Sequence, residues 1–332
     1  MVLGDVALLV VGVLALWLGA RLLVTGASRL ASAAGVSALV AGLTVVAFGT
    51  SAPEIAVSAE AAFGGRGDIA VGNVVGSNLF NLAVTLGIVA LLSPFRVSET
   101  LVRRDAVAMA ASTVVAIAVL ANGVVSRFEG VVLIALLIGY LGALGVAIRN
   151  ANPAQSFAGD SIGAEPSVPA PIGTEQPADL DRGELRPVLE TGRVLAGLAL
   201  VIAGGRVLID AAVGLALTAG ISEWAIGATI VAAGTSLPEL VTSVVAARED
   251  DVGIAAGNVI GSNVFNALGV LGVAAVVRPL AVDPAVFAGL AWLGIVTALA
   301  TIVLATGRQL TRLEGVALLV IGASYWIVSV AG

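Results

Sequence analysis

The chain has 332 residues, of which 59% are hydrophobic and only 11% are charged, with a formal net charge of −6. Soluble domains carry more charged and fewer apolar residues, so this composition excludes an ordinary soluble protein and indicates an integral membrane protein. The sequence contains neither Cys nor His. Disulfides, thiolate or imidazole metal sites and enzymes that need a histidine base are therefore excluded.

Apolar runs fill most of the chain, and each is long enough to cross a membrane as a helix of about 20 residues. We expect an all-α membrane protein with ten transmembrane helices. Their predicted positions are residues 5–30, 36–63, 68–92, 101–121, 127–149, 190–218, 222–247, 252–277, 284–306 and 311–330.

Residues 150–190 form the one substantial linker, which is rich in Pro, Gly, Ser, Ala and acidic residues. This composition predicts a flexible, solvated connector, which we favour over a regulatory segment. The linker separates residues 1–149, with five predicted helices, from residues 191–332, with five more.

Arginines are concentrated in alternate loops. Most lie on the side of the 150–190 linker, and only Arg66, Arg127 and Arg278 fall in loops on the other side. The positive-inside rule therefore predicts a multi-pass cell-membrane protein with the linker in the cytoplasm and both termini outside.

The two halves repeat each other at a spacing of 185 residues without a gap. Residues 72–81 read GNVVGSNLFN and residues 257–266 read GNVIGSNVFN, with eight identities in ten positions. Each half has an odd number of predicted helices, so the second half enters the membrane in the opposite sense. The sequence thus predicts two inverted-topology repeats of five helices.

A glutamate follows a proline in the middle of an apolar run in each half: GTSAPE at Gly49–Glu54 and GTSLPE at Gly234–Glu239. Proline removes a backbone donor and clashes with the preceding turn, so we expect helices 2 and 7 to be broken there and to free carbonyl oxygens. Packing alone does not require a buried glutamate at the same place in both halves, because such a residue is costly in a membrane.

The second repeated motif places Ser77 one turn from Asn81, and Ser262 one turn from Asn266. We expect helices 3 and 8 to be broken as well and to converge with helices 2 and 7 near the membrane midplane. Carboxylate, carbonyl and hydroxyl oxygens suit hard cations such as Ca²⁺ and Na⁺, and two glutamates match the charge of one Ca²⁺.

These paired motifs and their repetition resemble the alpha-repeats of the cation/calcium exchanger superfamily, particularly the prokaryotic type of its sodium/calcium exchanger branch. The resemblance implies a ten-helix exchanger fold with alternating access, in which helices one and six slide across a core that holds the sites. It also implies a metal-binding set: Glu54 and Glu239 as central Ca²⁺ ligands; the carbonyls of Thr50 and Thr235 beside them; Ser51, Ser77, Ser236, Ser262 and the carbonyls of Ala47 and Ala232 at flanking Na⁺ sites; and Asn81 and Asn266 completing the centre.

Many sodium/calcium exchangers carry Asp where this chain has Asn266, which leaves the ion stoichiometry open. The proton-coupled branch typically has a Glu in its second motif, and the Ser and Asn pattern here favours Na⁺ as the counter-ion.

We therefore expect a secondary active antiporter that exchanges Ca²⁺ for Na⁺, not an enzyme, with no cofactor. Its expected partners are the lipid bilayer and the transported ions, without nucleic acid, and we expect a monomer. A proton-coupled or K⁺-dependent antiporter remains the alternative. A cation channel is less favoured because one chain already supplies a complete site.

Arg21 and Arg206 recur within helices one and six, where we expect them to snorkel or to form pairs, such as Arg206 with Asp210.

Overall fold

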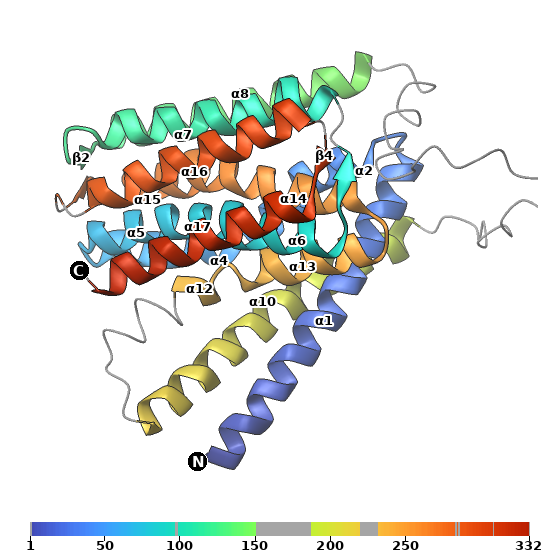
Figure 1. The fold of residues 1–332 in the computed structure, drawn as a ribbon, viewed down its shortest axis with the longest axis horizontal. Coiled ribbons are helices and arrows are strands. Elements are labelled where there is room, and N and C mark those ends of the chain that lie inside the picture. Colours follow the sequence, from blue (N-terminus) through green and yellow to red (C-terminus); the bar gives the residue numbers. More distant parts are fainter. Residues whose placement is uncertain are drawn as a thin grey trace, which may run out of the picture.

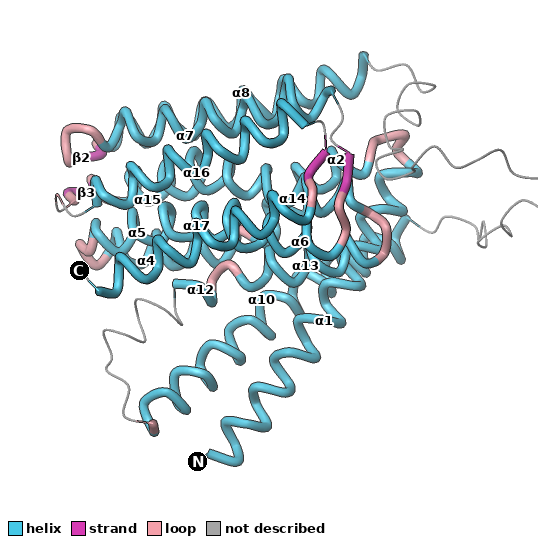
Figure 2. Tube along the Cα trace, in the orientation of Figure 1, coloured by secondary structure: helices cyan, strands magenta, loops and turns pink. Residues whose placement is uncertain are grey.

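The computed structural model describes residues 2–96, 99–150, 187–219, 232–282, 284, 286–307 and 309–331. Most of the predicted 150–190 linker and the first part of the helix predicted at 222–247 lie outside these ranges. The described residues form a bundle of helices with a few very short strands (Figures 1 and 2).

Five helices are long and uninterrupted: α1 (Val2–Ala33), α8 (Arg127–Asn150), α10 (Pro187–Thr218), α16 (Val286–Gly307) and α17 (Arg312–Ala331). The other helical stretches are assembled from shorter pieces, in which η marks a π-helical turn. They are α2 (Ala38–Ala41), η1 (Gly42–Val46), α3 (Ala47–Thr50), α4 (Ala52–Phe63), α5 (Gly67–Leu79), η2 (Phe80–Thr85), α6 (Leu86–Leu92), η3 (Leu101–Ala106), α7 (Val107–Leu120), α12 (Ala232–Gly234), α13 (Leu237–Arg248), α14 (Val252–Val264), η5 (Phe265–Val270) and α15 (Leu271–Val277).

By length and apolarity, six helices of the described ranges could each cross a membrane, or seven if the bent pair Ala38–Thr50 and Ala52–Phe63 counts as one span. Two of them, Gly67–Leu92 and Val252–Val277, are largely buried inside the protein and form its centre. The other four of the six turn most of their surface outward, as expected of helices that face lipid. The protein is thus an all-α membrane protein.

The predicted break in helix 2 is confirmed, because the chain bends by 42° between α3 and α4. The bend falls at Ser51, and Pro53 lies in the first turn of α4, where its missing N–H costs no helical hydrogen bond. In the second half, α12 ends at Gly234 and α13 begins at Leu237, with Pro238 in the equivalent place.

The predicted breaks in helices 3 and 8 are wrong. Both remain helical throughout, as Gly67–Leu92 and Val252–Val277. Neither stretch contains a proline, so every residue keeps its backbone donor. The second motif instead ends in a π-helical turn, η2 or η5, in which the helix widens locally without opening.

Two short antiparallel sheets join the halves. Strand β1 (Phe95–Arg96) pairs with β4 (Gln309–Leu310), and β2 (Val124–Val125) pairs with β3 (Leu280–Ala281). A step of 185 residues converts β1 into β3 and β2 into β4, so each sheet takes one strand from each half. One residue of every strand is buried, which anchors the sheets to the ends of the bundle.

Helices α1 and α10 lie side by side and project from the bundle (Figure 1). They run antiparallel, since Gly12 faces Leu208 whereas Gly26 faces Val194. Glycines permit the close approach: a Cβ atom added to Gly19 would lie 2.8 Å from the backbone nitrogen of Val201. Close packing through small residues of this kind is typical of helix pairs in membranes.

Glycine is also required where the second motif packs against the first half. A Cβ atom on Gly257 would clash with the carbonyl oxygen of Leu39. We expect Gly257→Ala to lower stability by about 1–3 kcal/mol through overpacking. The melting temperature in detergent, followed by tryptophan fluorescence, should fall by several degrees. Gly139→Ala is the control, because nothing within 4 Å would meet its Cβ atom. A Gly257→Ala protein that melts at or above the parent temperature would contradict this packing.

Candidate cation site

Two carboxylates lie completely buried at the centre of the bundle. Glu54 is in the first turn of α4 and Glu239 is in the first turn of α13. The positive end of a helix dipole favours a negative charge in this position. None of the ion pairs found among the described residues includes either glutamate. The charge of the pair must therefore be balanced by something other than a basic side chain.

Each carboxylate accepts a hydrogen bond from a serine of the opposite half. The Ser51 hydroxyl donates to Glu239 Oε1 at 3.4 Å, and the Ser236 hydroxyl donates to Glu54 Oε1 at 3.2 Å. All four residues are fully buried. The two predicted motifs therefore meet, and each completes the surroundings of the other's glutamate.

Asn73 orients the first motif, although the sequence analysis did not single it out. Its amide nitrogen donates to the Glu54 carbonyl at 3.3 Å and to the Ser58 hydroxyl at 2.9 Å. Its amide oxygen accepts a hydrogen bond from the Thr235 hydroxyl at 3.3 Å. Asn73 thus ties α4 to α5 and links both to the second half.

Asn258 makes the same set of contacts in the other half. Its amide nitrogen donates to the Glu239 carbonyl at 3.3 Å and to the Ser243 hydroxyl at 3.0 Å, and its oxygen accepts from the Thr50 hydroxyl at 3.1 Å. Both asparagines are the second residue of the repeated GNVxGSNxFN stretch. The presence of the same residue at this position in both halves was the sequence signal that could have identified Asn73 and Asn258 as part of the site.

Several polar atoms of the site are buried without a hydrogen-bond partner among the described residues. They are Oε2 of Glu54 and of Glu239, and both side-chain amide atoms of Asn81 and of Asn266. Buried polar groups normally have partners, so each exception needs an explanation. Carboxylate and amide oxygens in a dehydrated setting are suited to binding a hard cation such as Ca²⁺ or Na⁺.

The other predicted ligands lie close to this centre to different degrees. The Ser77 hydroxyl lies beside the Glu54 carboxylate, and the Ser262 hydroxyl is 3.5 Å from that of Thr50. The buried Ala47 carbonyl accepts from the Thr50 hydroxyl at 3.4 Å. Ala232 is the first residue of α12, and its side chain is outside the described part.

Asn81 and Asn266 are less closely connected. They lie in η2 and η5, one turn along from Ser77 and Ser262, and both are fully buried. No hydrogen bond of the described residues ties them to the glutamates. The described ranges also contain no group of three or more acidic, His or Cys side chains, so neutral oxygens must supply most ligands of any bound cation.

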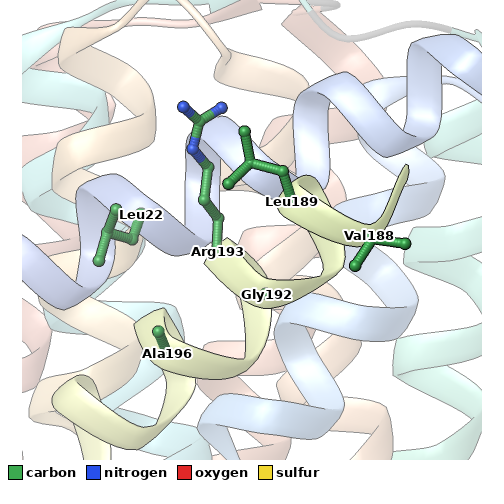
Figure 3. Close-up of a pocket in the computed structure, with 6 residues that line it drawn as sticks. All are labelled: Leu22, Val188, Leu189, Gly192, Arg193 and Ala196. Atoms are coloured by element: carbon green, nitrogen blue, oxygen red, sulfur yellow. The ribbon is translucent and has the colours of Figure 1, made fainter. Parts of the chain in front are cut away.

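A separate apolar pocket of about 540 Å³ lies between α1 and α10 (Figure 3). Its lining is Leu22 of α1 with Val188, Leu189, Gly192, Arg193 and Ala196 of α10. The lining includes no carboxylate and one positive charge. This pocket is therefore chemically unsuited to a cation.

An apolar bundle that encloses two carboxylates and a set of neutral oxygens is the architecture of a membrane cation transporter. The chain belongs to the sodium/calcium exchanger family: the family described as Sodium/calcium exchanger protein matches residues 5–146 and 190–331. The predicted relationship is thus confirmed, and it places the chain among cation antiporters of the membrane.

Individual proteins are similar to this chain over most of its length. The chain is 36% identical over 280 residues to Inner membrane protein YrbG of Escherichia coli (strain K12). The aligned region covers 84% of this chain and 81% of that protein. It is 31% identical over 307 residues to Sodium/calcium exchanger MaX1 of Methanosarcina acetivorans, covering 85% and 86%. A solved structure of the sodium-calcium exchanger NCX_Mj matches with a TM-score of 0.79 and 30% identity, over 100% of this chain and 99% of that one.

The role of the unpredicted amides can be tested with Asn258→Ala. This change removes the hydrogen bonds of the Asn258 amide to the Glu239 carbonyl, the Ser243 hydroxyl and the Thr50 hydroxyl, and each lost hydrogen bond costs about 0.5–1.5 kcal/mol. We expect a lower melting temperature and weaker Ca²⁺ binding by isothermal titration calorimetry. Asn150→Ala, at the exposed end of α8, serves as the control. Unchanged values in Asn258→Ala would remove this residue from the site.

Proposed function

We propose that the protein is a secondary active antiporter that exchanges Ca²⁺ for Na⁺ by alternating access. The observation that carries the proposal is that Glu54 and Glu239 are both buried and that each accepts a hydrogen bond from a serine of the other half. A site assembled from both halves can open toward either side of a membrane if the halves rearrange symmetrically. Membership in the sodium/calcium exchanger family supports this reading.

We further propose ten crossing helices arranged as two inverted-topology repeats, residues 1–149 and 191–332. Contacts that exchange partners under the 185-residue step support this arrangement. The pair Thr50 with Asn258 becomes Thr235 with Asn73, and the sheet β1 with β4 becomes β3 with β2. Such exchange is expected of two copies related by an axis in the membrane plane.

In this proposal Glu54 and Glu239 supply two negative charges to one Ca²⁺ ion. Their unpartnered Oε2 atoms support the assignment. The carbonyls of Thr50 and Thr235 complete the Ca²⁺ site, and Asn81 and Asn266 close its centre. The remaining oxygens, which belong to Ser51, Ser77, Ser236, Ser262, Ala47 and Ala232, are assigned to flanking Na⁺ sites.

The proposed orientation has both termini outside and the 150–190 linker in the cytoplasm. The arginine distribution supports it through the positive-inside rule. In Figure 1 both termini lie at the end of the bundle opposite to the C-terminal end of α8 and the N-terminal end of α10, which flank the linker. We propose that one chain is the functional unit, since it contains both halves of the site.

The counter-ion is the first point to test. Purified protein in vesicles loaded with Na⁺ should take up ⁴⁵Ca²⁺ when diluted into Na⁺-free buffer. Parallel vesicles with K⁺ or H⁺ gradients should show little uptake. Uptake driven by H⁺ or K⁺ alone would establish the alternative coupling, and single-channel currents would establish a channel. Absence of uptake under every gradient would reject the antiporter.

The proposed ligands predict a matched pair of inactive variants. Glu54→Gln and Glu239→Gln each remove one charge needed by Ca²⁺ while preserving side-chain shape. We expect both to lower ⁴⁵Ca²⁺ uptake at least a hundredfold, with an unchanged size-exclusion profile. Glu99→Gln is the control, because Glu99 is exposed and pairs with Arg103 in its own surface turn. Transport at the parent rate in either glutamate variant would refute the assignment.

Asn266 offers a test of the neutral position at the centre. Asn266→Asp adds a third negative charge beside the two glutamates, which favours binding of a proton or an additional Na⁺. We expect Ca²⁺ uptake to become more sensitive to acid than that of the parent, with several-fold lower rates at pH 6 than at pH 8. A pH profile identical to the parent's would show that residue 266 lies outside the ion-binding region.

A further inference from the structure

On the linker side of the site, α1 and α13 are held together. Arg21 Nε of α1 lies 3.0 Å from Glu249 Oε1, directly after α13 ends. The Arg21 guanidinium also lies over the Trp17 ring, 5.2 Å from its centroid. Val24 of α1 is completely buried. The structure is therefore closed between these two helices.

On the opposite side, the equivalent helices line a cavity of about 360 Å³. Its walls come from α4, α10 and the turn between α12 and α13, and it extends from the charged residues Glu60, Arg206 and Asp210 to Thr235 and Gly234. Glu60 is six residues beyond Glu54, which is about 9 Å along the helix. Pro53 and Pro238, which directly precede the two buried glutamates in the sequence, also line the cavity, so it lies next to the carboxylate site.

The closed and open sides are built from the same repeated surfaces. Ile209 lines the cavity and is only half-buried, whereas its counterpart Val24 is completely buried on the closed side. Thr242 is completely buried with an unpartnered hydroxyl among the described residues, whereas its counterpart Val57 lines the cavity. Alternation would bring together the surfaces of α4 and α10 and part those of α1 and α13.

Arg206 is the counterpart of Arg21 and lines the cavity. It is exposed and takes part in none of the ion pairs of the described residues, so the expected pair with Asp210 is wrong. Asp210 belongs to the same helix as Arg206 and cannot hold two helices together. Glu60 stands across the cavity on α4, as Glu249 stands across from Arg21. The repeat places Gly64 where Glu249 would be, and Glu60 supplies the acid one turn earlier.

We propose that Arg206 and Glu60 form an ion pair that closes this cavity when the cation site opens toward the linker side. The ion pair between Arg21 and Glu249 separates at the same time. We call the pair of Arg21 with Glu249 the linker-side latch and the pair of Arg206 with Glu60 the opposing latch. The inference rests on the proposed function, because two latches that form in alternation presuppose alternating access. Closure also neutralises Arg206, whose charge would otherwise repel cations held at the site. The two latches share their chemistry and differ by one turn in register.

Thiol labelling tests the proposal, because the sequence contains no Cys. Ala56→Cys lines the cavity and reports its opening through the rate of reaction with a membrane-impermeant maleimide added outside intact cells. In this background Glu249→Gln weakens the linker-side latch, so we expect labelling to slow about two- to fivefold, the scale of an exposed ion pair. Total thiol after denaturation normalises each rate.

The second change identifies the partner. Adding Glu60→Gln or Arg206→Gln to the Glu249→Gln protein should restore the labelling rate, because the opposing latch is then weakened too. Asp210→Asn is the matched control, with the same change of charge in the same cavity, and it should not restore the rate. The proposal is overturned if Glu249→Gln leaves labelling unchanged, if neither Glu60→Gln nor Arg206→Gln restores the rate, or if Asp210→Asn restores it equally.

This readout is independent of the transported ions. Labelling that follows the expected pattern in a protein that moves no Ca²⁺ in vesicles would preserve the latch and reject the Ca²⁺ exchange. Ca²⁺ exchange driven by Na⁺ without the labelling pattern would reject only the latch.

Discussion

The burial of two carboxylates in an apolar bundle is the constraint on which the rest of the structure depends. An acidic side chain at the centre of a membrane costs about 2.5 kcal/mol or more, and Glu54 and Glu239 are both completely buried. Among the described residues no basic side chain compensates them. Hydroxyl donors and helix N-termini stabilise the charges in part, and a bound cation would provide the remainder.

This constraint accounts for the local departures from regular helix. The bend at Ser51 brings a hydroxyl to the opposing glutamate and also starts a new helix whose first turn contains Glu54. Asn73 and Asn258 then fix the glutamate backbones to neighbouring helices. Because every one of these contacts has a counterpart in the other half, neither half forms a complete site alone.

The sequence was informative wherever chemistry was duplicated. Proline next to a repeated glutamate predicted the bend near Ser51. The inverted repeat predicted that the two motifs lie close together. The sequence was misleading at the second motif, where we expected a break, whereas a π-helical turn keeps the helix continuous. Asn73 was overlooked because its role depends on Thr235, 162 residues away, and such a contact leaves no trace in local spacing.

The two small sheets bear on how the chain is made. Phe95 pairs with Leu310, and Val125 pairs with Leu280, so strands that leave the ribosome early have partners near the end of the chain. The backbone groups of β1 and β2 must remain with water or lipid headgroups until the last helices have been inserted. Tertiary closure of the ends of the bundle is consequently a late step of biogenesis, and a chain that stopped after the first half would be left with open strand edges on both sides of the membrane.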